Sequence, residues 1–230
     1  MRPPKFLMRI FSLRYPYIGI VLFFLIAAHG KNQGGGAVKF KCVVHKHVRT
    51  TVFWVGEPGS ADNAYIPNDQ STWDGSWKKH YGGFDDPNNR NGYWPDGFTP
   101  HENPFYCALP YSDLDSDGNR KNSSTTVVCW SAAGTKMHES LCKNHWVRIL
   151  FKGKNCYAQW EDAGPFGEND SAYVFGSHGP QQHAGLDVSP AVRDFLGLNG
   201  LNFTEWEFVD SLEVPAGPWR RIITRSGVSK

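Results

Sequence analysis

The chain has 230 residues, of which 24 are Lys or Arg and 22 are Asp or Glu. Four of the basic residues and none of the acidic ones lie in the first 30 positions, so the rest of the chain has a net charge of −2. Such a balance gives no general attraction for nucleic acid or for an anionic membrane surface, and no nucleic-acid partner is expected. The 24 glycines, 15 prolines and 14% aromatic residues predict a β-rich domain with many turns.

Residues 1–30 have the pattern of a secretory signal peptide. Basic residues precede the apolar run Ile18–Ala28, and small residues follow it. The run is short for a membrane span, so removal of the signal peptide is favoured over an uncleaved membrane anchor. Attachment to a membrane is expected only through this segment, if it stays uncleaved. The sequence therefore predicts a secreted, periplasmic or extracellular protein, with a spacer over residues 31–44 and a single domain over 45–225.

The first strand is predicted over residues 48–55, where polar and apolar residues alternate. Residues 57–102 are rich in Gly, Pro, Asn and Asp but also contain many large aromatic residues, which predicts a long ordered insertion rather than a linker. Exposed aromatic rings in this insertion would suit stacking on sugars. The alternative is that the rings form a small core beneath the loop.

Further strands are predicted over residues 103–111, 125–130, 146–151, 156–162 and 206–209, with an edge strand over 219–224. Residues 152–155 are predicted to form the turn of a hairpin. A short helix is predicted after Asp187, because Ser189 suits its N-cap, Pro190 its first position and Gly197 its end.

The chain has five cysteines. Cys129 and Cys142 flank a short connection between predicted neighbouring strands, so they are the expected disulfide pair. Cys107 and Cys156 lie in apolar strands and are expected to be buried thiols or a second bridge. No metal or cofactor site is predicted, since the pair His45 and His47 has no third ligand nearby.

Two carboxylates are the only candidates for catalysis. Asp162 ends an apolar strand before the Gly164-Pro165 turn, and Asp187 immediately precedes the predicted helix. Glycoside cleavage uses such a pair, with one group as the acid and the other as a base or stabiliser. The alternative interpretation is structural, because Asp also suits the capping of turns and helices.

Three segments resemble one known family. They are Asp162-Ala163-Gly164-Pro165-Phe166, then Leu186-Asp187-Val188-Ser189, then Phe195-Leu196-Gly197. The order of these segments, with their turn and helix-capping residues, resembles that of the rare lipoprotein A-like double-psi β-barrel family. This family includes expansins, barwin-like proteins and lytic transglycosylases. Ala163 stands where this family often has Arg, and the loop over residues 166–185 is longer than the family's. The resemblance implies a mainly β fold, a six-stranded double-psi β-barrel with a short helix after Asp187 and a long aromatic-rich insertion.

The same resemblance implies that Asp187 is the catalytic acid and that Asp162 is its partner across a groove. Residues expected to contact the substrate are Thr51, Trp54, Trp160, Tyr173 and His183. The expected function is cleavage of a cell-wall glycan, such as peptidoglycan or a cellulose-like polymer, by a lytic transglycosylase or glycoside hydrolase acting as a monomer without a cofactor. The alternatives are an expansin-like protein that loosens the polymer without cleaving it and a structural secreted barrel.

Overall fold

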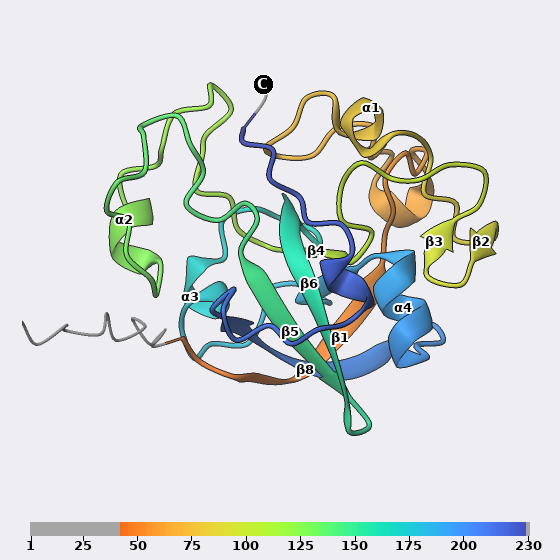
Figure 1. The fold of residues 1–230 in the computed structure, drawn as a ribbon. Coiled ribbons are helices and arrows are strands. Elements are labelled where there is room, and N and C mark those ends of the chain that lie inside the picture. Colours follow the sequence, from red (N-terminus) through yellow and green to blue (C-terminus); the bar gives the residue numbers. More distant parts are fainter. Residues whose placement is uncertain (1–41, 229–230) are drawn as a thin grey trace, which may run out of the picture. The chain divides into compact units, whose positions relative to one another are not determined.

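The computed structural model describes residues 42–228 of the chain, so the predicted signal peptide and most of the spacer lie outside the described residues. Six strands form a closed barrel in the order β1-β7-β4-β6-β5-β8 (Figure 1). Two neighbouring pairs, β1 with β7 and β4 with β6, are parallel, and the other pairs are antiparallel. The barrel strands are β1 (His45–Val52), β4 (Tyr106–Leu109), β5 (Trp146–Phe151), β6 (Lys154–Ala163), β7 (Leu186–Val188) and β8 (Asn202–Val209).

Short elements lie in the connections between these strands. The segment between β1 and β4 contains the most of them, and it lies on the opposite side of the barrel from α2 (Figure 1). These elements are η1 (Ala61–Asn63), α1 (Trp77–Tyr81), β2 (Arg90–Asn91), β3 (Trp94–Pro95), α2 (Ser124–Val127), α3 (Ser171–Val174), α4 (Pro190–Leu196) and η2 (Pro218–Arg220).

The barrel strands alternate between an inward and an outward face. Cys107 and Leu109 of β4 are buried in the main core with residues of every other barrel strand. Tyr106 and Ala108 point to the outer face of β4, where a second buried cluster forms with Trp77 and Tyr81 of α1. The segment between β1 and β4 therefore covers this outer face, and its buried aromatic rings act as a small core.

Buried polar contacts fasten this segment to the barrel. Asp85 is fully buried and accepts a hydrogen bond from the Tyr106 hydroxyl at 2.8 Å. Arg90 Nη1 pairs with Asp85 Oδ1 at 2.5 Å, while Arg90 Nη2 donates to the Tyr93 carbonyl at 2.6 Å. Because both charged groups are held by several partners, these contacts fix where the segment lies on β4.

Most predicted elements of the second half of the chain are confirmed. The strand over residues 146–151 is β5, and the helix α4 has Ser189 as its N-cap and Gly197 in the left-handed conformation at its end. Lys152 and Gly153 both have positive φ and form the hairpin turn, with Phe151 paired to Lys154.

Two predicted strands are wrong. The predicted strand over residues 125–130 is replaced by the helical turn α2, in which the backbone N–H of Val128 bonds the carbonyl of Ser124. Residues 219–224 form no strand. They begin in the turn η2, and Thr224 instead hydrogen bonds with Gln159 and Asn103. In both places hydrogen bonds between side chains and the backbone satisfy groups that a strand would pair, as the Thr126 hydroxyl does with the Ser123 carbonyl and Gln159 does with the Thr224 N–H.

The predicted Cys129–Cys142 disulfide is also wrong. Cys129 is bonded to Cys42, and Cys142 is a buried free thiol, as are Cys107 and Cys156. The connection between Cys129 and Cys142 is not bounded by two neighbouring strands, because α2 precedes it, so the geometric reason for that pairing disappears. The bridge instead holds the start of the described chain against the segment after α2.

Removing the Cys42–Cys129 bridge should lower the free energy of unfolding by about 2–4 kcal/mol, because the bridge closes a loop spanning 87 positions and restricts the unfolded chain. Urea unfolding of the double variant Cys42→Ser/Cys129→Ser would measure the loss. Reducing agent should weaken the wild type to the same extent and leave the double variant unchanged. Equal midpoints for the variant and the oxidised wild type would contradict this expectation.

Within residues 42–228, no helix has the length and apolar character needed to span a bilayer. The same part of the chain contains no cluster of three or more His, Cys, Asp or Glu side chains arranged to hold a metal ion.

Candidate functional site

Four residues form a row across four adjacent strands on the outer face of the barrel. Thr51 of β1 pairs with Asp187 of β7, Asp187 also pairs with Ala108 of β4, and Ala108 pairs with Asp162 of β6. Paired residues on neighbouring strands point to the same face. Because neighbouring strands are about 4.8 Å apart, the backbones of the two aspartates lie roughly 10 Å apart. The barrel thus brings together both predicted carboxylates and Thr51.

A β-bulge puts Asp162 in this row. Trp160 pairs with Cys107, but the next residue of β4, Ala108, pairs with Asp162, so Glu161 is an extra residue. The bulge turns Asp162 toward the outer face while Trp160 stays in the core. The Glu161 carboxylate pairs with Lys143 at 2.7 Å.

Asp187 is half-buried, and its side chain has a single described hydrogen-bond donor, the Thr51 hydroxyl. Removal from water raises the pKa of Asp187 to about 7, the Thr51 hydrogen bond lowers it, and the charge of Glu57 raises it further. The helix that follows is capped by Ser189 rather than by Asp187. Asp187 is therefore a partly accessible carboxyl group whose pKa suits proton transfer near neutral pH.

Asp162 is more enclosed, with 8% of its surface exposed. One of its oxygens, Oδ1, accepts hydrogen bonds from the backbone N–H groups of Thr72 at 2.7 Å and Ala163 at 2.8 Å. Burial nevertheless raises the pKa of Asp162 to about 7, although these two hydrogen bonds oppose the rise and the charge of Asp187 adds to it. Asp162 therefore links the segment between β1 and β4, called the covering segment below, to the barrel. It also faces the site.

Glu57 is a third carboxylate of the site that sequence patterns alone did not single out. A turn in which Glu57 N–H bonds the Trp54 carbonyl at 3.0 Å follows β1, and Asn68 donates to Glu57 Oε2 at 2.9 Å. Its charge acts on Asp187. The one available signal was its position six residues after Thr51, just past the end of the strand.

Replacing Glu57 by Gln should lower the pKa of Asp187 below about 7, because it removes a negative charge that disfavours ionisation of Asp187. A carboxyl-carbon NMR titration would measure the change, with Glu213→Gln as a control for loss of an exposed charge elsewhere. An unchanged Asp187 titration in Glu57→Gln would show that the two groups do not interact.

The predicted substrate-contacting aromatic residues divide into two groups. Trp160 and Tyr173 are buried, at 0% and 1% exposure, so the structure places neither of these rings at the surface. Trp160 Nε1 donates to the Asp162 carbonyl at 2.8 Å, and the Tyr173 hydroxyl donates to the Gly185 carbonyl at 3.0 Å. A regular strand would place Trp160 on the same face as Asp162, but the bulge at Glu161 puts them on opposite faces.

Trp54 and His183 remain near the surface. Trp54 is half-buried just after β1, and its Nε1 is buried without a hydrogen-bond partner. His183 is exposed in the loop before β7, and the structure gives it no contact with Asp187. Phe166, in the segment that follows Asp162, is an additional exposed ring, with 58% of its surface accessible.

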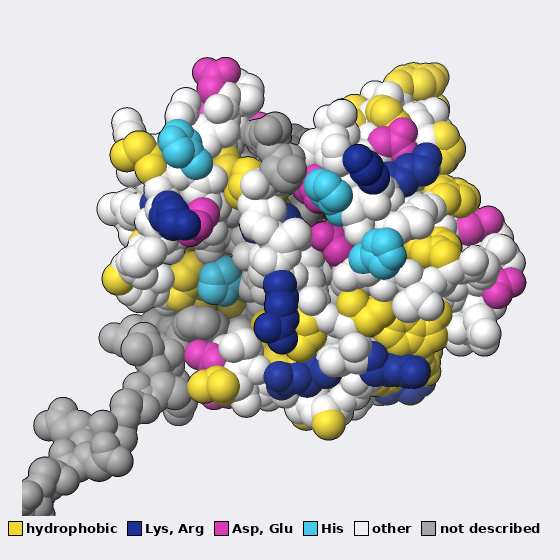
Figure 2. Space-filling view, turned by 45° about the horizontal axis from the view of Figure 1, so that its top comes forward, with side chains coloured by type: hydrophobic (Ala, Val, Ile, Leu, Met, Phe, Trp, Pro, Cys, Tyr) yellow, Lys and Arg dark blue, Asp and Glu magenta, His cyan; other side chains and the backbone are white. Residues whose placement is uncertain are grey.

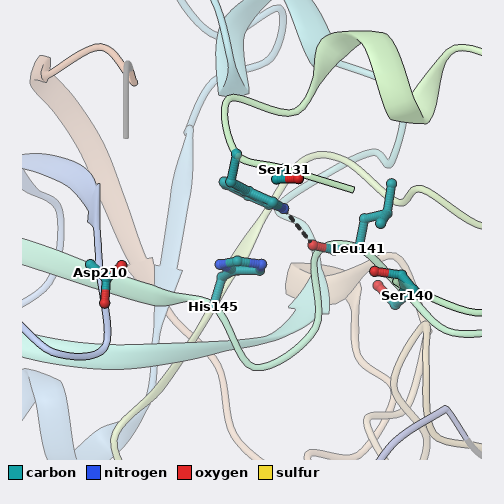
Figure 3. Close-up of a pocket in the computed structure, with 7 residues that line it drawn as sticks. Ser131, Ser140, Leu141, His145 and Asp210 are labelled. Atoms are coloured by element: carbon teal, nitrogen blue, oxygen red, sulfur yellow. Dashed lines mark hydrogen bonds between the residues drawn. The ribbon is translucent and has the colours of Figure 1, made fainter. Parts of the chain in front are cut away.

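A separate cavity of about 240 Å³ contains serine, histidine and aspartate side chains, a combination that merits comparison with nucleophilic sites. His145 stacks on Trp130 at 3.8 Å between ring centroids, and Trp130 Nε1 donates to the Leu141 carbonyl at 2.9 Å (Figure 3). Burial lowers the pKa of His145 to about 4. Ser140 donates its hydroxyl proton to Asp113 at 2.6 Å rather than to a histidine, so its hydroxyl is not activated as a nucleophile.

Comparisons with models of protein families, with curated proteins and with solved structures gave no significant match. The function is therefore inferred from the row of Thr51, Asp187, Ala108 and Asp162.

Proposed function

We propose that the protein is a secreted, cell-wall glycan-acting protein in which Asp187 is the general acid, and that its barrel is of the double-psi type. The two parallel strand pairs, β1 with β7 and β4 with β6, support the barrel assignment. The single observation that supports the function most is Asp187 itself, a half-buried carboxyl group with a pKa of about 7 and one hydroxyl donor.

Among glycan-cleaving reactions, this arrangement favours a lytic transglycosylase. In that reaction a hydroxyl group of the sugar attacks the anomeric carbon and no water is needed. One carboxyl group is then sufficient, because it can protonate the leaving glycosidic oxygen and later accept the proton of the attacking hydroxyl. Asp162, which is largely enclosed and bonded to two backbone N–H groups, is better placed to position the site and add charge than to activate water.

The same enclosure of Asp162 favours a second candidate function, expansin-like loosening without cleavage. An inverting hydrolase needs a second carboxylate that is free to hold water. Asp162 has one oxygen committed to structural hydrogen bonds, so a protein that uses Asp187 only to bind and disrupt a polymer is also compatible with this site.

Digestion of purified peptidoglycan and of amorphous cellulose would test the proposal. Wild-type protein and Asp187→Asn would be compared, and the products identified by mass spectrometry. Anhydro-sugar products, lighter by one water than hydrolysis products and missing with Asp187→Asn, are the expected result. Hydrated products would indicate a hydrolase. A lack of products with retained polymer binding would favour loosening, and a lack of both would contradict any action on glycans.

A further inference from the structure

A second cavity, of about 570 Å³, lies beside the covering segment and has a size typical of small-ligand sites. Its walls come from α1, from the residues just before β4 and from the C-terminal residues 223–228. Figure 2 shows histidine, basic and acidic side chains gathered around a hollowed part of one face. The lining residues are Lys79, His80, His101, Glu102, Ile223, Arg225, Ser226, Gly227 and Val228.

The rim of this cavity is basic. Lys79, His101 and Arg225 are exposed residues that line it. His80 is held in place by the fully buried Asp74, with His80 Nδ1 and Asp74 Oδ2 2.7 Å apart. Several cationic or imidazole groups on one rim favour an anionic ligand group, such as a carboxylate.

The inner wall is acidic and has unused acceptors. Glu102 is 6% exposed, and its Oε1 accepts a hydrogen bond from the Ser226 hydroxyl at 2.6 Å. Its other oxygen, Oε2, is buried and has no hydrogen-bond partner, and within residues 42–228 no basic side chain forms an ion pair with Glu102. A buried carboxylate oxygen without a donor is costly, so this wall favours a ligand that brings a positively charged donor.

The ammonium group of Lys143, whose charge interacts with Glu102, already has partners. Lys143 Nζ forms its ion pair with Glu161 at 2.7 Å and contacts the Ser226 hydroxyl at 3.2 Å. Glu161 Oε1 is also buried without a partner. Two buried carboxylates whose charges act on Lys143, Glu102 and Glu161, thus each keep one oxygen without a hydrogen-bond partner.

We propose that this cavity binds a zwitterionic amino-acid group. The ligand's ammonium group binds at Glu102, and its carboxylate binds at the rim formed by Lys79 and Arg225. This inference rests on the proposed function and specifies its substrate class, a wall glycan that carries peptides with a free amino-acid end rather than a neutral cellulose-like polymer.

The cavity is connected to the Asp187 row through residues that are close in sequence. The Thr72 N–H that bonds Asp162 is two positions before Asp74, which holds His80 of the cavity. Glu161 precedes Asp162 and contacts Lys143, which reaches Ser226. A peptide attached to the glycan could therefore be held on one side of Asp162 while the sugar chain lies at Asp187.

Calorimetric titration with diaminopimelate, a diamino acid with zwitterionic ends, would test the proposal on the full chain. Wild-type protein should bind diaminopimelate. The di-N-acetyl form lacks the ammonium charges and the diamide lacks the carboxylate charges, so each should bind at least about tenfold more weakly. Binding of inorganic phosphate or of the N-acetyl form as strongly as diaminopimelate would overturn the proposal, because the cavity would then be a simple anion site. No binding of diaminopimelate would overturn it too.

Two variants assign the contacts. Glu102→Gln keeps an oxygen for Ser226 and should weaken diaminopimelate about tenfold or more without weakening the N-acetyl form. Arg225→Gln, at an exposed position that should not affect folding, should weaken both ligands. If neither variant changes diaminopimelate binding, the ligand lies elsewhere and the proposal is wrong.

Asp187→Asn should bind diaminopimelate as the wild type does, which separates the two proposals. Diaminopimelate binding without cleavage of any polymer would overturn the proposed enzyme and leave the cavity's assignment standing. Cleavage of peptidoglycan without diaminopimelate binding would overturn the cavity's assignment and leave the proposed enzyme standing.

Discussion

Asp187→Asn should reduce the rate of glycan cleavage by about 10²–10⁴-fold, which is the range expected when a general acid is removed. The asparagine amide has nearly the same shape and can still accept the hydrogen bond of Thr51, but it cannot donate a proton to the glycosidic oxygen. Initial rates of product release from peptidoglycan would measure the loss, and binding of the polymer should persist.

The pH dependence of the wild type follows from the direction of the same pKa shift. The pKa of Asp187 is raised to about 7, so the group is mostly protonated at pH 5–6 and activity should fall as the pH rises through about 7. The raised pKa also means that Asp187 contributes fully to stability below its unfolded-state pKa, near 3.9. This contribution is lost as the pH rises toward 7. Asp187→Asn should therefore be as stable as the wild type, or more stable, at pH 8.

Asp162→Asn is the matched control for this prediction. The asparagine oxygen can still accept the hydrogen bonds of Thr72 and Ala163, so the covering segment should stay in place. The loss of activity should be smaller than that of Asp187→Asn. An equal or larger loss in Asp162→Asn would show that Asp162 acts on the substrate directly and would contradict its assignment as a positioning group.

Replacing Arg90 by Ala should lower the free energy of unfolding by about 3–5 kcal/mol, the range for breaking one partner out of a buried ion pair. The Arg90 side chain is 6% exposed. It lies between Asp85, which is fully buried, and Asp194, which is partly exposed, with Arg90 Nε 3.3 Å from Asp194 Oδ2. Without the guanidinium group, Asp85 keeps its negative charge inside the protein beside the Tyr106 hydroxyl but without a positively charged partner.

Urea unfolding followed by tryptophan fluorescence would measure the effect of Arg90→Ala. Arg148→Ala is the control, because Arg148 pairs with Glu207 on the barrel surface and such pairs contribute about 1 kcal/mol or less. Similar losses in the two variants would show that the Arg90 contacts do not hold the covering segment on the barrel.

The sequence predicted best the elements whose local signals agree. The helix α4 has its cap, its proline and its terminal glycine within nine residues, and β5 and β6 are joined by a two-residue turn. Asp162 and Asp187 could also be selected, because Asp162 ends a strand pattern before a clear turn and Asp187 precedes a helix with clear capping signals. The pattern could not show that Ala108 lies between them, because this depends on pairing between strands far apart in the chain.

The errors also have physical causes. A regular β6 would put Asp162 on the same face as Trp160, but a single extra residue, Glu161, turns Asp162 to the outer face while Trp160 stays in the core. The disulfide was assigned from distance along the sequence, whereas Cys42 and Cys129 meet only in the folded chain. Glu57 was missed because its effect on Asp187 arises from the turn after β1 and not from any motif.

The pairing of β1 with β7 and β8 has a consequence for how the protein folds. Thr51 meets Asp187 across 136 positions, and Thr50 meets Thr204 across 154. Contacts between such distant positions form slowly, because a long stretch of flexible chain must close before they contribute any stability. A polypeptide released before β8 is synthesised cannot close the barrel, so it would lack the row that contains Asp187. The protein should therefore gain activity late in folding, together with the final closure of the barrel. In a refolding experiment, cleavage activity should not return before the tryptophan fluorescence of the folded protein.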